Sequence, residues 1–100
     1  MLERLAGLEQ EYDDVVAQLS DPAVLGDRHT LRDVSRRHKQ LEAIVTRYRE
    51  YRQALEDLAT AKEMIGDATG DDKDMVRAEI DQAEEAITRL EDELKVLLLP

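Results

Sequence analysis

Side chains able to do acid–base, nucleophilic or metal chemistry are plentiful in this sequence, but their spacing does not assemble a catalytic site. Neither His29 nor His38 has a Glu three residues before it, as a di-iron helical bundle would need. Asp13 and Asp14 are adjacent, and adjacent residues on a helix do not face each other. Ser20 has no His in a suggestive position for a hydrolase triad. We therefore expect no catalytic residue, no cofactor and no metal ion.

Two further groups of residues could suggest a binding function, but a structural role explains each of them better. The acidic residues between positions 67 and 74 depart from the spacing of a calcium-binding EF-hand loop, so we interpret them as an acidic loop before a helix. Tyr12, Tyr48 and Tyr51 fall at or beside the apolar positions of their segments. We expect them to pack along a helix seam rather than to stack on bases.

Basic residues recur at nearly four-residue spacing in the middle of the chain. This spacing places them on one face of a helix, where two interpretations stay open. The basic helix can simply pair with acidic neighbouring helices, since exposed ion pairs are usually solvated surface. Alternatively, the patch contacts phosphate or an acidic protein. The candidate contact residues are Arg28, Arg32, Arg36 and Lys39.

The apolar side chains that would support these residues predict three helices. Apolar residues recur at steps of three and four over residues 2–20, 28–65 and 72–98. The break at 21–27 combines a capping Asp, a Pro suited to a first helical turn and a Gly, and it suggests one short turn of helix. A second break, at 66–72, separates the other two segments.

The resulting fold class is all-α. In the segment 72–98 the apolar positions alternate steps of four and three, the 3.5-residue repeat of a left-handed coiled-coil seam. Short connections make neighbouring helices antiparallel. We expect an elongated antiparallel three-helix bundle with coiled-coil-like seams and a long central helix, formed by residues 1–100 as a single helical domain.

Composition excludes several classes of protein. The 100 residues include no Cys and only three aromatic side chains, so a disulfide framework and a thiolate nucleophile are absent. The chain carries a net charge of -10, and the segment 72–98 is strongly acidic. The N-terminus lacks the pattern of a signal peptide, and no apolar run is long enough to cross a membrane. We expect a cytoplasmic protein that binds neither membrane nor DNA.

Several stretches, in order along nearly the whole chain, resemble the N-terminal helical domain of bacterial class I peptide chain release factors. They are the break at 20–22, the stretches 41–51 and 57–64, and the tail 90–100, in which an aliphatic run ends in Pro100. The Leu-Leu-Leu-Pro ending is more similar to the factor that recognises UAA and UAG than to its UGA-recognising relative.

The resemblance implies a role in translation termination, in which the whole factor recognises a stop codon and triggers hydrolysis of peptidyl-tRNA on the ribosome. The family's Gly-Gly-Gln motif and codon-recognising tripeptide lie C-terminal to this domain, and neither occurs in this sequence. The domain is then a helical arm near the stalk base of the large subunit, in contact with rRNA or a ribosomal protein, and it affects communication with the recycling GTPase. We expect the chain to continue beyond Pro100.

Two other functions stay open at this point. A free-standing coiled-coil adaptor or homodimer would use exposed parts of the seams against a partner. A tRNA-gripping helical arm of an aminoacyl-tRNA synthetase usually has two long helices, and the net charge of -10 opposes tRNA as the main ligand. An enzyme has the least support.

Overall fold

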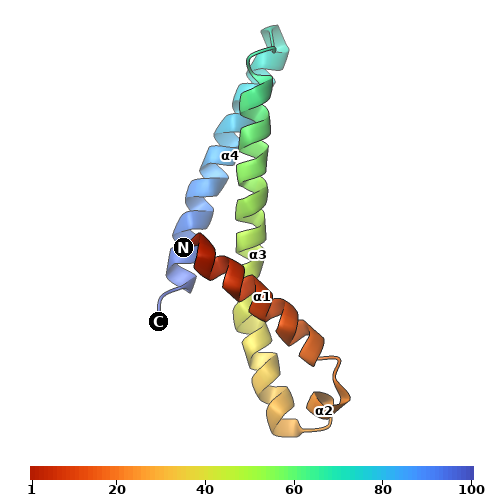
Figure 1. The fold of residues 1–100 in the computed structure, drawn as a ribbon. Helices are drawn as coiled ribbons and strands as arrows, with labels where there is room; N and C mark the ends of the chain where they lie inside the picture. Colours follow the sequence, from red (N-terminus) through yellow and green to blue (C-terminus); the bar gives the residue numbers. More distant parts are fainter. The chain divides into compact units, whose positions relative to one another are not determined.

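The computed structural model describes residues 1–100, which form helices and no strand, confirming the all-α fold class (Figure 1). Two compact units divide the chain, Met1–Thr46 and Arg47–Pro100, so the longest helix contributes to both. No helix is both long enough and apolar enough to cross a membrane. The helices are α1 Leu2–Gln18, α2 Pro22–Leu25, α3 Arg28–Met64 and α4 Gly70–Leu97.

The break before α3 contains a one-turn helix, as its capping residues suggested. The Asp21 carboxylate accepts a hydrogen bond from the backbone N–H of Ala23 at 2.9 Å, and Pro22 occupies the first helical position, where no N–H is needed. Backbone bonds between residues three apart tighten the chain at Ser20, so α1 ends at Gln18 rather than near residue 20.

α3 starts from an aspartate cap. The Asp27 carboxylate accepts hydrogen bonds from the backbone N–H of His29 at 3.1 Å and from the Thr30 hydroxyl at 2.9 Å, and these bonds lower the pKa of Asp27. Because no Gly or Pro follows until the helix ends, α3 runs without interruption for 37 residues, or roughly 55 Å.

In the first unit, α1 runs antiparallel to the first part of α3 (Figure 1). The ring of Tyr12 lies 5.3 Å from the ring of His38, and the Glu11 carboxylate binds the Arg37 guanidinium. These two neighbouring contacts fix the register between the helices. The buried apolar residues of this unit are Leu5, Val15, Val24, Leu41 and Val45.

In the second unit, the rest of α3 and α4 form an antiparallel hairpin (Figure 1). The 3.5-residue repeat predicted for α4 is confirmed, because its buried residues are spaced seven, seven and four apart. Tyr48 and Tyr51 lie buried on the facing part of α3. Burial and the negative charge of Glu91 raise the pKa of Tyr51. The buried α4 residues are Val76, Ala83, Leu90 and Leu94.

The turn between α3 and α4 explains why α4 begins at Gly70 and not at residue 72. Thr69 is extended, and Gly70 has a φ of 57°, a left-handed conformation that glycine adopts without a Cβ clash. The carbonyl of Thr69 accepts a bond from the N–H of Lys73 at 3.4 Å, so the helical hydrogen bonds already begin there.

Candidate functional site

The four candidate contact residues form one surface, the basic stripe, in the first half of α3. All four side chains are exposed. At roughly 100° of rotation per residue, they fall within about 80° of one another around the helix. α3 is continuous over this region, so the stripe is carried by a rigid element rather than by a loop. Its members are Arg28, Arg32, Arg36 and Lys39.

The basic stripe faces away from the packed side of the same helix. Leu41 and Val45, which are fully buried, lie roughly 140–180° around α3 from the middle of the stripe. The stripe is therefore directed outward from the face that packs within the first unit, and burial of the helix does not hide it.

The stripe has few internal partners. Arg32 approaches the carboxylate of Asp33 at 3.5 Å, but both side chains are more than half exposed, so this pair contributes little. Arg28, Arg36 and Lys39 make no ion pair in the structure. Three of the four cations are thus available to an external anion.

Other arginines of α3 serve the structure, as the ion-pairing interpretation predicted. Arg37 donates from Nε and Nη2 to the two carboxylate oxygens of Glu11, both at 2.6 Å. This bidentate bond lowers the pKa of Glu11 and raises the pKa of Arg37. In the second unit, Arg47 donates from Nε to Glu93 at 3.2 Å. The basic helix α3 therefore has two kinds of arginine. Some form ion pairs with a neighbouring helix, and others face outward into solvent.

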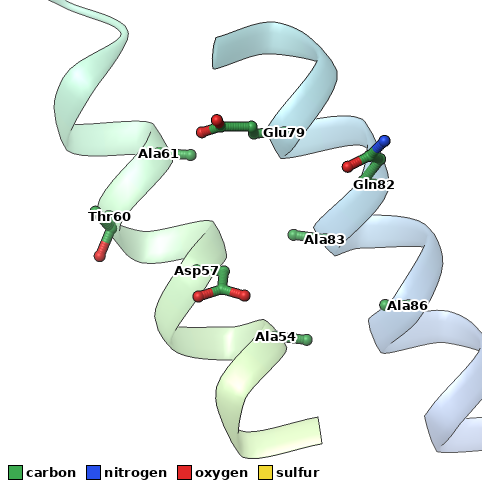
Figure 2. A pocket seen from close by; sticks show the side chains of 8 residues that line it. All are labelled: Ala54, Asp57, Thr60, Ala61, Glu79, Gln82, Ala83 and Ala86. Atoms are coloured by element: carbon green, nitrogen blue, oxygen red, sulfur yellow. The ribbon is translucent and has the colours of Figure 1, made fainter. Parts of the chain in front are cut away.

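An open groove between the second half of α3 and α4 is lined largely by alanine (Figure 2). The methyl groups of Ala54 and Ala61 on α3 and of Ala83 and Ala86 on α4 are too short to fill the space between the helices, and a volume of about 440 Å³ results. Asp57, Thr60, Glu79 and Gln82 complete the lining, with no histidine or serine among them. The groove thus offers two carboxylates and one hydroxyl, that of Thr60, but no histidine that could act as a base toward it.

No group of three or more His, Asp or Glu side chains is arranged to hold a metal ion. His38 lies beside Tyr12 and 3.9 Å from the carboxylate of Glu42, in a packing position along the first unit. One further surface, a hollow at the α3–α4 turn lined by Met64 and Met75, was not expected from the sequence. Their positions on opposite sides of a helix break were the only sequence signal for it.

Comparison with known proteins identifies the family to which the chain belongs. The PCRF domain matches residues 8–100, which includes the whole basic stripe. The chain belongs to the PCRF domain family. This membership confirms the resemblance to peptide chain release factors drawn from the sequence.

Several similar proteins are named peptide chain release factor 1. The chain is 41% identical to that of Clostridium novyi (strain NT) over 101 residues and 42% identical to that of Oleidesulfovibrio alaskensis over 100 residues. A third, from Alkaliphilus oremlandii, is 41% identical over 102 residues. Each match covers 100% of this chain but only 28–29% of the relative. No solved structure matches the chain.

Proposed function

We propose that this chain is the N-terminal helical part of a peptide chain release factor of the UAA/UAG-recognising type and acts in translation termination in the cytoplasm. The observation that carries the proposal is the 41% identity to release factor 1 over the entire chain, together with the PCRF match over residues 8–100. Neither a free-standing adaptor nor a synthetase arm gains support from these relatives.

Within that factor, the chain would serve as a ribosome-contacting arm and carry out no catalysis itself. Long helices with outward-facing cations suit positioning, and the alanine-lined groove between α3 and α4 contains no histidine or serine. The parent factor would promote peptidyl-tRNA hydrolysis through residues outside this chain. The arm's partners would be the stalk-base region of the large subunit, as rRNA or ribosomal protein, and the recycling GTPase.

The basic stripe is the surface that we assign to this contact. Its unpaired cations suit phosphate oxygens or an acidic protein, whereas α4 has acidic residues that would repel rRNA. The arm would accordingly present the first half of α3 and α1 to the ribosome, and not α4.

Codon-dependent release tests the proposed function as a whole. The full-length protein is added to ribosomes that carry formyl-methionyl-tRNA beside UAA, UAG or UGA, and released formyl-methionine is measured. We expect release at UAA and UAG but not at UGA. Equal inactivity at all three codons would contradict the assignment to a release factor.

Charge reversal tests the basic stripe. In the full-length protein, Arg32→Glu with Arg36→Glu should weaken ribosome binding roughly tenfold near 0.1 M salt and flatten the dependence of binding on salt, because each lost phosphate contact removes counterion release. The control pair Arg77→Glu with Lys95→Glu makes the same change in net charge on exposed residues of α4. Equal binding by the stripe variant and the wild type would rule out the stripe as the contact surface.

A further inference from the structure

At the turn between α3 and α4, the hairpin has an apolar surface that stays exposed and is not packed between the two helices. Met64, near the end of α3, is 51% exposed, and Met75, in the first turns of α4, is 63% exposed. Together with Ala68 and Val76 they line a hollow of about 380 Å³, which we call the methionine groove.

The rim of the methionine groove is acidic. The remaining lining residues are Asp67, Asp72 and Glu79, and no basic side chain lines the hollow. None of these three carboxylates forms an ion pair within the chain. The surrounding segment 67–81 contains six acidic and two basic residues, so the rim lies in a negative field.

These two properties together fit one kind of ligand. Methionine is flexible and polarisable, so paired methionines can fit apolar side chains of varied shape. Carboxylates without an ion pair around an apolar hollow complement cations that flank an apolar side chain of a partner. Nucleic acid would bring phosphate against the acidic rim, and a second copy of this chain would bring a net charge of -10 toward it.

We propose that the methionine groove binds a basic protein segment, which inserts an apolar side chain between Met64 and Met75 and places Lys or Arg side chains against the acidic rim. An amphipathic helix has both features on adjacent faces. This binding surface goes beyond the proposed function, because the residues of the basic stripe take no part in it.

The test uses the full-length protein and a fluorescein-labelled amphipathic peptide of about 14 residues, with leucines on one face and lysines on the other. Binding is followed by fluorescence anisotropy. The double substitution Met64→Gln with Met75→Gln keeps side-chain length but removes the apolar surface, and we expect about tenfold weaker binding. Val96→Gln, at an exposed apolar residue of α4 outside the groove, should leave binding unchanged.

Charge is tested separately. Asp72→Asn with Glu79→Gln should weaken peptide binding about threefold and flatten its dependence on salt, since two rim charges are lost. Glu84→Gln with Glu85→Gln removes two exposed charges elsewhere on α4 and should have a smaller effect. Circular dichroism melts of all variants check that the helices remain folded.

Two outcomes would overturn the proposal. One is equal affinity for a control peptide in which serine replaces every leucine, because binding would then require charge alone. The other is that a labelled single-stranded RNA binds the protein and that the methionine substitutions weaken this binding. The groove would then accept nucleic acid. Neither result depends on codon-dependent release, so failure of this proposal and failure of the proposed function are distinguishable.

Discussion

Arg32 and Arg37 show how angular position on one helix decides what an arginine does. Arg37 lies on the side of α3 that faces α1, where the Glu11 carboxylate accepts both of its hydrogen bonds. Arg32 lies on the outward side, where its neighbour Asp33 offers only a weak, solvated pair. The same residue type therefore stabilises the fold at one position and stays exposed, with only a weak ion pair, at another.

The Glu11–Arg37 pair makes the stability of the first unit depend on pH. Its bidentate bond lowers the pKa of Glu11 below the ordinary value of 4.5. The unfolded state therefore binds more protons than the folded state just below that value, so stability is present above pH 4.5 and is lost as the pH falls through the folded pKa. Both side chains are about 40% exposed, which limits the contribution to roughly 0.5–1 kcal/mol.

Glu11→Gln should consequently lower the free energy of unfolding by roughly that amount, 0.5–1 kcal/mol, at pH 7 and by much less at pH 3. Urea unfolding of the chain at the two pH values measures both differences. Asp14→Asn serves as the control, because Asp14 is exposed and its contact is with Gln10 on the same helix. A deficit of equal size at pH 3 would show that the carboxylate charge is not the cause.

At the scale of elements, the interface between α3 and α4 is well packed in one part and incompletely filled in another. Leu90 and Leu94 are fully buried, whereas Ala54, Ala83 and Ala86 leave an open groove nearer the turn (Figure 2). Alanine suits the helical backbone but buries little apolar area. The hairpin is therefore continuous in secondary structure and uneven in packing.

Filling the alanine groove should stabilise the hairpin. Ala86→Leu adds methylene groups that can cover the facing alanines without overpacking, because the groove is open, and we expect a gain of roughly 0.5–1 kcal/mol in the free energy of unfolding. Ala59→Leu, at an exposed position outside the groove, is the matched control and should have almost no effect. Denaturant unfolding compares the two variants. A loss of stability in Ala86→Leu would mean that the helices cannot accommodate the larger side chain.

At the scale of the whole molecule, the net charge of -10 is unevenly distributed. The first half of α3 carries outward-facing cations, whereas α4 is strongly acidic, so the basic stripe attracts anions and α4 repels them. Such a distribution favours binding in a defined orientation over strong overall affinity.

The same net charge predicts that the chain does not associate with itself. Two copies would bring like charges together, and the exposed apolar residues of the methionine groove are surrounded by carboxylates. Sedimentation velocity from about 5 to 200 µM at 0.15 M salt should give a constant monomer mass, and the dimer population should stay below detection. If the mass rises with concentration, the chain associates with itself, and homodimerisation would again be a candidate function of these helices.

The sequence by itself determined the helices, because the information that sets them is local. Apolar spacing, the aspartate before each helix start at positions 21 and 27, and the absence of Gly and Pro from α3 act within a few residues of the chain. The basic stripe was predictable for the same reason, since residues three and four apart must share a helix face. Even so, α4 begins two residues earlier than its apolar spacing indicated, because the carbonyl of Thr69 already accepts a hydrogen bond from the N–H of Lys73.

Only the tertiary structure decided which side chains meet across the helices. Glu11 lies 26 residues from Arg37 and Arg47 lies 46 residues from Glu93, and many carboxylates were possible partners until packing fixed the register. The methionine groove likewise arises only when the turn folds α4 back along α3 and brings Met75 beside Met64. Helix periodicity fixes a face of each helix, but the choice between partners of similar chemistry depends on burial and register, which the whole unit determines.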